Sequence, residues 1–317
     1  MDGTVTEYWR SGRGRLGICP IGWVNGFLGW GHAKGAQVMD EIGRLGYAAS
    51  ENSAVYPTDP ARLREELQAR GLVLSGAYRW VNFAYEERLA DEIEAAKRHV
   101  RFCAQAGADV ANLAEAAHSV WDARGPVTTV TPLSSPQWRR VAAALEEVGT
   151  FARGLGVSLA VHPHGGTAIE TPGEILTLLE LTDPELVGLC LDTGHVVYGG
   201  GDPVGLARQV AERVVYVHLK DVRADVLAEL RRGTELGLSE LGVPFEEAAR
   251  RHLFCPPGQG YLDFGAVVAA LRAAAYDGWY VVEAEQDPEL HPPLEAGRSA
   301  LAYMSELLAR PAAGGGG

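Results

Sequence analysis

Imidazole and carboxylate side chains follow four short apolar runs of this sequence. The runs are SLAVHPH (158–164), VGLCLDTGH (187–195), VVYVHLKDV (214–222) and WYVVEAEQ (279–286). Because side chains alternate along a strand, residues two apart share a face, as His162 and His164 would. Mixed nitrogen and oxygen ligands suit Mn²⁺, Co²⁺, Zn²⁺ or Fe²⁺ better than Mg²⁺ or Ca²⁺. We therefore expect a divalent metal site where these runs end.

Each of these groups also has an ordinary structural explanation. A single histidine at a strand end is more often a hydrogen-bonded structural residue, and a single acid there often caps a helix or pairs with a lysine. Lys220, for example, would either reach a substrate oxygen or form a salt bridge to Glu283 or Glu285. The whole set is harder to explain structurally, because isolated acids and imidazoles are costly to bury.

The four runs belong to a regular alternation of strand-like and helix-like segments. Eight strand candidates lie at 15–23, 47–52, 73–80, 109–116, 158–164, 187–195, 214–222 and 279–286. Helical patterns follow them near 33–46, 59–71, 86–107, 136–156, 172–182, 203–212, 264–276 and 293–309. Such alternation requires parallel strands with right-handed crossovers, and eight units predict a closed (β/α)8 TIM barrel. An open doubly wound sheet is the alternative, but its GxGxxG turn is absent from PIGWVNG after the first strand.

The barrel is expected to be a single domain over 15–309, with a flexible tail at 1–14 and a disordered tail at 310–317. A long insertion at 223–262 follows the seventh strand candidate, where a lid or a subunit contact is expected. Its glycine-rich end, PGQGYLDF (257–264), could also grip a phosphate.

Composition limits the classes of function. With 41 acidic and 28 basic residues the net charge is −13, which argues against broad binding to nucleic acid or to an anionic membrane. The four cysteines form no CxxC pair, which favours a reduced, cytoplasmic protein. No run of about 18 apolar residues is present, so no membrane span is expected.

Several segments resemble the xylose-isomerase-like barrels, a superfamily of sugar isomerases, epimerases and endonuclease-IV-type enzymes. They are GICPIGWVN (17–25), LAVHPHGGT (159–167), PELVGLCLDTGH (184–195), VVYVHLKDVR (214–223), PPGQGYLDF (256–264) and GWYVVEAEQDP (278–288). The resemblance covers about residues 15–307. The last segment, together with VHLKDVR, is similar to a dehydratase branch of the family that acts on 2-keto-myo-inositol.

The resemblance implies one divalent metal, Mn²⁺ or Co²⁺ before Zn²⁺ or Fe²⁺. The implied ligands are His162, Asp192, His218 and Glu283, with His164 and Glu285 as replacements for the first and last. The implied catalytic groups are His195, His164, Glu285 and Lys220. The implied substrate contacts are Trp23, Asn25, Glu51, Trp80, Glu115 and Arg223. Two departures from the family pattern, His-Pro-His-Gly-Gly-Thr at 162–167 and Gly-Gln-Gly at 258–260, fall on the expected substrate side.

The implied reaction is a metal-dependent hydro-lyase step on this cyclic ketone. A base removes the proton beside the carbonyl, and an acid protonates the departing β-hydroxyl. A metal-dependent isomerase or epimerase would share the enolate step and is the main alternative. A nuclease of the endonuclease-IV type would need more histidine and glutamate ligands for its zinc ions, and a net charge of −13 disfavours binding to DNA. A non-catalytic barrel is a further alternative, but it would not need the His/Asp/His/Glu set. The resemblance also implies a small polyol or ketose substrate and a homodimer or homotetramer.

Overall fold

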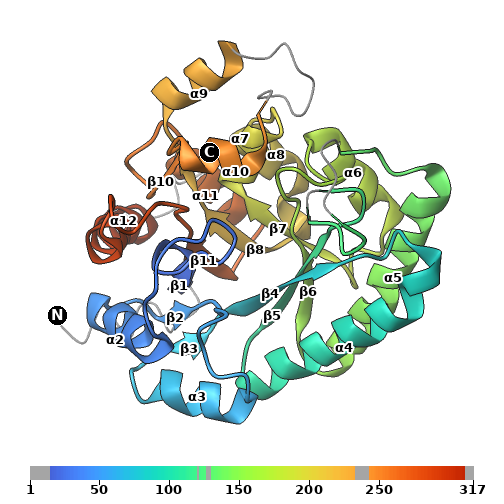
Figure 1. Cartoon of the computed structure of the whole chain (residues 1–317), viewed down its shortest axis with the longest axis horizontal. Coiled ribbons are helices and arrows are strands. Elements are labelled where there is room, and N and C mark those ends of the chain that lie inside the picture. Colours follow the sequence, from blue (N-terminus) through green and yellow to red (C-terminus); the bar gives the residue numbers. More distant parts are fainter. Residues whose placement is uncertain (1–14, 120, 126–129, 233–242, 311–317) are drawn as a thin grey trace, which may run out of the picture.

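The computed structural model describes residues 15–119, 121–125, 130–232 and 243–310, and within them a parallel sheet closes into a barrel (Figure 1). Its strands are β1 (Arg15–Ile18), β2 (Ala49–Ser50), β3 (Val73–Leu74), β4 (Gly76–Val81), β5 (Val110–Glu115), β6 (Ser158–Val161), β7 (Gly188–Asp192), β8 (Val214–Leu219) and β11 (Trp279–Val282). Around the barrel they run in the order β3-β2-β1-β11-β8-β7-β6-β5-β4.

The third barrel strand changes partner at Ser75. Its first segment, β3, pairs with β2, and its second segment, β4, pairs with β5. Hydrogen bonds from the Ser75 N–H to the Ser50 carbonyl and from the Asn52 N–H to the Gly76 carbonyl join the two edges. The nine segments therefore occupy eight strand positions, and the expected (β/α)8 barrel is confirmed.

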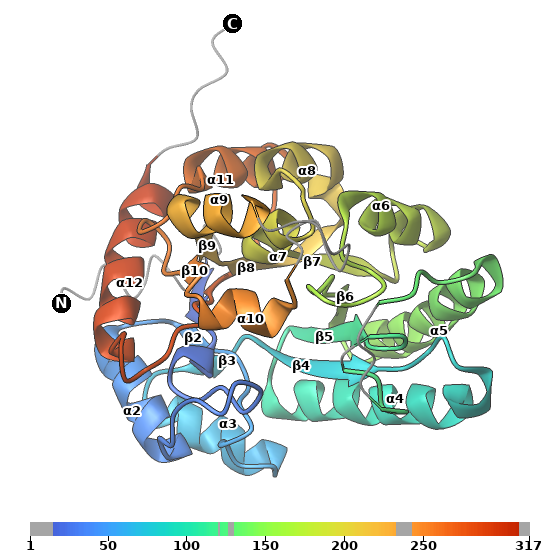
Figure 2. The same ribbon diagram turned by 45° about the horizontal axis from the view of Figure 1, so that its top comes forward.

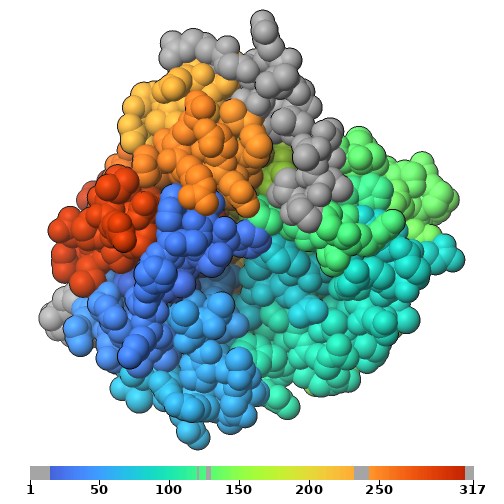
Figure 3. All heavy atoms as spheres, viewed as in Figure 1, coloured from blue at the N-terminus to red at the C-terminus, as the bar shows by residue number. Residues whose placement is uncertain are grey.

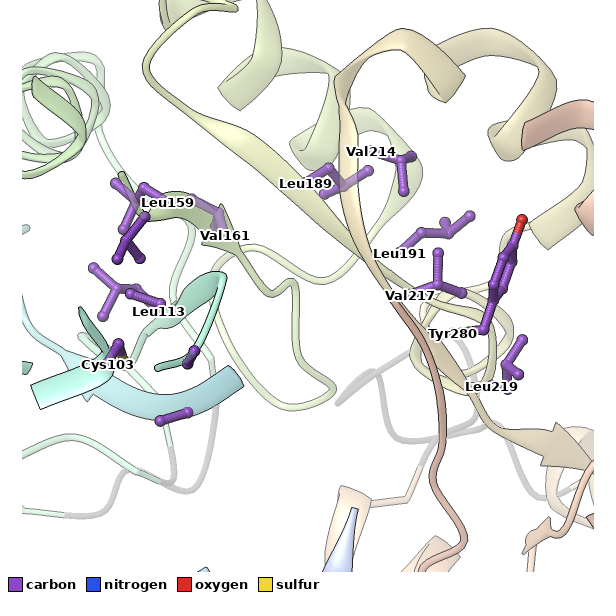
Figure 4. Close-up of a cluster of buried hydrophobic side chains, with 14 of the residues drawn as sticks. Cys103, Leu113, Leu159, Val161, Leu189, Leu191, Val214, Val217, Leu219 and Tyr280 are labelled. Atoms are coloured by element: carbon purple, nitrogen blue, oxygen red, sulfur yellow. The ribbon is translucent and has the colours of Figure 1, made fainter. Parts of the chain in front are cut away.

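Helices cover the outside of the strands (Figure 2). They are α2 (Gly35–Leu45), α3 (Pro60–Gln68), α4 (Leu89–Ala106), α5 (Ser135–Gly154), α6 (Pro172–Leu181), α8 (Pro203–Val210), α11 (Phe264–Ala273) and α12 (Pro293–Ala309), with short 3-10 turns at Pro20–Gly22, Glu86–Arg88 and Ala211–Arg213. Leu189 and Leu191 of β7 belong to the apolar layer between strands and helices (Figure 4). Cys190 lies in a separate cluster inside the barrel, as the alternation of side chains requires.

The sixth predicted unit differs from the expectation at its strand end. The run predicted as a strand over 187–195 stops at Asp192, and the short helix α7 (Thr193–Tyr198) begins immediately after it. The Asp192 carboxylate accepts a hydrogen bond from the backbone N–H of His195, which is the usual way that aspartate starts a helix. His195 therefore projects from a helix rather than from a strand.

The insertion after β8 packs on the barrel through its own apolar cluster. It contains β9 (Asp221–Val222), α9 (Ala224–Arg232), α10 (Phe245–Arg250) and β10 (Phe254–Cys255), and β9 pairs with β10 in an antiparallel ribbon. Phe245 and Phe254 pack with Leu28 of the loop that follows β1. Figure 3 shows the orange surface of α10 beside the blue surface of that loop. The insertion thus helps to cover the end of the barrel that carries the carboxyl ends of the strands.

The glycine-rich turn of the insertion binds a carboxylate of the chain itself. Asp221 accepts hydrogen bonds from the backbone N–H groups of Val222, Gly258, Gly260 and Leu262. The phosphate grip considered for this turn is therefore wrong, because Asp221 already fills the anion position.

Replacing Gly260 with alanine is expected to lower the free energy of unfolding by about 2 kcal/mol or more. A Cβ at Gly260 would lie 2.2 Å from a carboxylate oxygen of Asp221 and 2.4 Å from the Val222 carbonyl oxygen. Urea unfolding would measure the change. Gly154→Ala, where an added Cβ meets nothing within 4 Å, is the matched control and should be neutral or slightly stabilising. An unchanged Gly260→Ala midpoint would contradict the anchoring role of this turn.

None of the described helices has the length and apolarity that crossing a membrane requires. The predicted tail at 1–14 lies outside the described residues. Of the predicted tail at 310–317 only Arg310 is described, and its carbonyl accepts a hydrogen bond from Arg272.

Candidate active site

Four side chains from neighbouring strand ends meet at one point of the barrel mouth. They are His162 after β6, Asp192 at the end of β7, His218 on β8 and Glu283 after β11, and one ligand atom from each lies within 4.8 Å of the others. Oδ2 of Asp192 is 3.5 Å from Nε2 of His162 and 3.5 Å from Nδ1 of His218. Nδ1 of His218 is in turn 2.5 Å from Oε2 of Glu283. The parallel register, which pairs Asp192 with His218, brings these groups to one level.

These four residues are buried, and several of their facing atoms make no well-aligned hydrogen bond among the described residues. They are Nδ1 and Nε2 of His162 and Oδ2 of Asp192, together with Nδ1 of His218 and Oε2 of Glu283, which face each other as an ion pair. An unpaired buried polar atom costs about 1–3 kcal/mol, and more when it is charged. A divalent cation would satisfy all four groups with ligands of suitable chemistry, so the residues fit a metal. The set contains His162 and Glu283 rather than His164 and Glu285.

Glu51 lies on the other side of His218. Its Oε1 is 3.3 Å from Nε2 of His218, and the side chain is 3% exposed. A carboxylate in this position fixes the orientation of a ligating imidazole. Sequence reasoning had expected Glu51 to bind a substrate hydroxyl, and it lines the central cavity as well.

The charges at this point shift the pKa values of two of these groups. Burial lowers the pKa of His218, but Cys190, Glu283 and Glu51 outweigh burial and raise that pKa well above its ordinary value. Burial raises the pKa of Glu283, but His218 and Lys220 outweigh burial and lower that pKa to about 2. Without a metal, the histidine therefore holds a proton against the carboxylate, and a bound cation would displace it.

The metal-free protein is expected to lose stability as pH falls from about 4.5 towards 2. The pKa of Glu283 is lower in the folded protein than its ordinary value of 4.5, so the unfolded chain binds more protons in this window. Folding is therefore favoured above the window and disfavoured as pH falls through it. Chemical unfolding at several pH values, with chelator present, should show a shallower dependence for Glu283→Gln, by up to about one proton per molecule. Equal slopes would contradict the ion pair with His218.

Lys220 lies fully buried behind the four-residue set. Its Nζ is 2.9 Å from Oε2 of Glu285, 3.2 Å from Oε1 of Glu283 and 3.6 Å from Oδ2 of Asp192. Burial lowers the pKa of Lys220, but these three carboxylates raise it well above its ordinary value. Of the two roles considered for this lysine, the salt bridge is present, to both glutamates. Gly194 makes room for it, since a Cβ there would lie 2.5 Å from the lysine Cγ.

His164 and His195 lie together, with ring centroids 4.0 Å apart. Nδ1 of His195 accepts a hydrogen bond from the Gly165 N–H, and its ring stacks on Phe245 of the insertion. Nδ1 of His164 contacts the Gly165 carbonyl at 2.8 Å, so this nitrogen carries the proton and Nε2 remains an acceptor. Burial is the main reason that the pKa of both rings falls well below the ordinary value, so both are neutral.

A cavity of about 180 Å³ opens beside the four-residue set. Five residues that the sequence predicted as substrate contacts or catalytic groups line this cavity: Asn25, Glu51, Trp80, His164 and Glu285. His195 and Lys220 lie behind this wall, 2% and 0% exposed.

Two aromatic residues of the cavity wall, Tyr78 and Phe27, are not among the site residues predicted from the sequence. Tyr78 lies two residues before Trp80 on β4, so the alternation of side chains could have identified it. Its hydroxyl is buried and has no hydrogen-bond partner within the described ranges. Phe27 packs edge-on against Trp80 and Trp121 and is 48% exposed at the cavity mouth. The loop sequence around Phe27 has no periodic pattern from which its position at the cavity could be predicted.

Three of the expected substrate contacts do not line this cavity. Trp23 lines a separate cavity of about 20 Å³ and donates its indole N–H to Glu41. Glu115 uses both carboxylate oxygens to accept the backbone N–H groups of Phe83 and Ala117, which ties two loops together. Arg223 is a partly exposed side chain paired with Asp225.

Comparison with known proteins gives the same architecture. A family model described as "Xylose isomerase-like TIM barrel" matches residues 39–307. This chain belongs to the xylose isomerase-like TIM barrel family. Family members named inosose dehydratase are 38% identical in Geobacillus kaustophilus, with 97% of each chain covered, and 34% identical in Geobacillus thermodenitrificans, with 92% of this chain and 96% of the relative covered.

Solved structures with the same fold superpose on most of this chain. An IOLI protein with a bound zinc atom has a TM-score of 0.69 at 16% identity and covers 93% of this chain and 98% of its own. A probable 3-DHS dehydratase from Bacillus anthracis has a TM-score of 0.65 at 12% identity and covers 92% of this chain and 98% of its own. At these identities the likeness concerns the fold.

Proposed function

We propose that this chain is an inosose dehydratase, a hydro-lyase that removes water from 2-keto-myo-inositol. The observation that carries the proposal is the buried His162, Asp192, His218 and Glu283 set beside a cavity lined by a neutral histidine and a protonatable glutamate. The relatives named inosose dehydratase, matched over nearly the whole chain, support the same substrate.

The four-residue set would hold one divalent cation, for which Mn²⁺ and Co²⁺ suit the mixed nitrogen and oxygen ligands. When bound, such a cation polarises the substrate carbonyl and stabilises the negative charge that develops on its oxygen. The zinc atom bound by the IOLI neighbour supports a divalent metal. Calorimetric titration of EDTA-treated protein with each metal would rank the affinities.

His164 and Glu285 are suited to the two proton transfers. His164 is neutral, has Nε2 as an acceptor and lines the cavity, so it would take the proton from the carbon beside the carbonyl. Burial raises the pKa of Glu285 above its ordinary value although Lys220 opposes the shift, so this carboxyl can deliver a proton to the departing hydroxyl. Lys220 and Asn25 hold that carboxyl in place, at 2.9 Å and 3.3 Å. His195 and Lys220 would then act as positioning residues.

Replacing Tyr78 with phenylalanine is expected to lower kcat/KM for inosose about tenfold. The Tyr78 hydroxyl is buried at the cavity wall without a partner in the described structure, so a substrate hydroxyl would be its acceptor or donor. Steady-state kinetics would measure the loss. Tyr303→Phe, on the exposed face of α12, is the matched control. Unchanged kinetics for Tyr78→Phe would remove this tyrosine from the substrate site.

The test of the proposed reaction is an assay of metal-loaded protein on 2-keto-myo-inositol, followed by the ultraviolet absorbance of the enolised dione. Appearance of the signal with Mn²⁺ or Co²⁺, and its loss after EDTA, would support the dehydratase. Exchange of the substrate proton in heavy water without that signal would instead indicate an isomerase or epimerase. A protein that binds no metal would overturn the ligand set itself.

The location and assembly of the enzyme are also proposals. All four cysteines are free, which supports the reducing cytoplasm. A homodimer or homotetramer stays a prediction, and light scattering of the purified protein would test it.

A further inference from the structure

A thiol lies directly beneath the four-residue set. Cys190 is two residues before Asp192 on β7 and belongs to the cluster inside the barrel. Because residues two apart on a strand share a face, its side chain points to the same interior one level lower. Its Sγ and one ring nitrogen each of His162 and His218 all lie within 4.8 Å of one another.

The two histidines therefore belong to two overlapping sets of ligand atoms. In the upper set they meet the carboxylates of Asp192 and Glu283, and in the lower set they meet the thiol of Cys190. Both nitrogens of His162 are buried without hydrogen-bond partners in the described part of the chain, whereas Nδ1 of His218 faces Glu283. The unsatisfied imidazole of His162 is an observation independent of the cysteine, and it points to a ligand at either level.

We propose that His162, Cys190 and His218 form a second metal position, selective for soft cations such as Zn²⁺ or Cd²⁺. The inference rests on the proposed function, because it uses two ligands of the proposed catalytic metal. Thiolate and imidazole favour Zn²⁺, whereas carboxylates favour Mn²⁺. On binding, the Cys190 S–H bond breaks, a metal–sulfur bond forms and one proton leaves to solvent.

The lower position requires only small movements of the side chains. Zinc bonds to sulfur at about 2.3 Å and to histidine nitrogen at about 2.0–2.1 Å, so tetrahedral ligand atoms stand roughly 3.5 Å apart. The present separations of up to 4.8 Å would close by roughly an ångström. A cation held there would lie deeper than one held by Asp192 and Glu283 and would take both histidines away from the upper set. Zinc would therefore inhibit activity supported by Mn²⁺.

Cadmium spectroscopy of EDTA-treated protein tests the proposal without reference to activity. Cd²⁺ bound through Cys190 should give an ultraviolet thiolate-to-cadmium charge-transfer band, and Cys190→Ser should abolish it. Cys103→Ser, another buried cysteine that lies on α4, is the matched control and should keep the band. The Zn²⁺ dissociation constant should rise about tenfold or more in Cys190→Ser, whereas that for Mn²⁺ should stay within about twofold.

The outcomes separate this inference from the proposed function. Bound Cd²⁺ without a charge-transfer band would overturn the lower position and leave the upper set intact. Absence of binding by calorimetry for Cd²⁺ and Mn²⁺ alike would overturn both. X-ray absorption of the zinc-loaded wild-type protein gives a result even if the variant fails to fold. A sulfur neighbour at about 2.3 Å supports the proposal, and a shell of nitrogen and oxygen only contradicts it.

Discussion

Replacing Asp192 with asparagine is expected to abolish tight binding of Mn²⁺ and to lower kcat/KM for inosose by about 10³-fold or more. Oδ2 of Asp192 lies 3.5 Å from each of the two histidine nitrogens and accepts no hydrogen bond within the described structure. In asparagine, an amide NH₂ group replaces either Oδ2 or Oδ1. The side chain therefore loses one of its two acceptor atoms and its negative charge. Kinetics with each metal, and calorimetric titration of the metal, would measure both losses.

The fold should tolerate this change. Oδ1 of Asp192 caps α7 by accepting the N–H of His195, and asparagine caps helices about as well as aspartate. Asp202→Asn is a matched control, because Asp202 caps α8 in the same way from an exposed position. We expect normal activity and metal binding for that variant. Full metal affinity in Asp192→Asn would refute the ligand assignment, provided that thermal unfolding shows a folded protein.

Replacing Lys220 with methionine is expected to destabilise the metal-free protein by about 3–5 kcal/mol. Lys220 is fully buried, and the three carboxylates of Asp192, Glu283 and Glu285 surround its ammonium. Methionine fills similar space but leaves these charges without a cation. Saturating Mn²⁺ should restore part of the stability, because it returns positive charge to two of the carboxylates. Unfolding in urea with and without metal would measure both effects.

The same substitution should change the pH profile of activity. Lys220 lowers the pKa of Glu285, so its removal raises that pKa further above the ordinary value. If Glu285 delivers the proton, the alkaline fall of kcat should move to higher pH, with a rate loss of about 10²–10³-fold. A lysine that only supports the fold would leave the profile in place. Lys97→Met removes a helix-surface lysine whose partners, Glu94 and Glu147, are each 54% exposed, so this control should cost under about 1 kcal/mol.

The sequence by itself determined which segments of this protein form the barrel strands. Alternation of apolar runs with helical patterns specified the barrel, because parallel strands joined by helices have few ways to close. It also placed His218 and Lys220 on one face, since side-chain direction along a strand repeats every two residues. The meeting of His162, Asp192, His218 and Glu283 follows from the same regularity, because the carboxyl ends of all barrel strands lie at one end.

Only the tertiary structure decided which of several similar residues reaches the cavity. Glu51 directly follows β2 and Glu115 ends β5. The first contacts His218 and lines the cavity, whereas both carboxylate oxygens of the second accept hydrogen bonds from backbone N–H groups. Asp221 fills the glycine-rich turn 37 to 41 residues ahead in the chain. A local pattern records the face of a side chain but not its partner, because the partner is set by packing between segments distant in sequence.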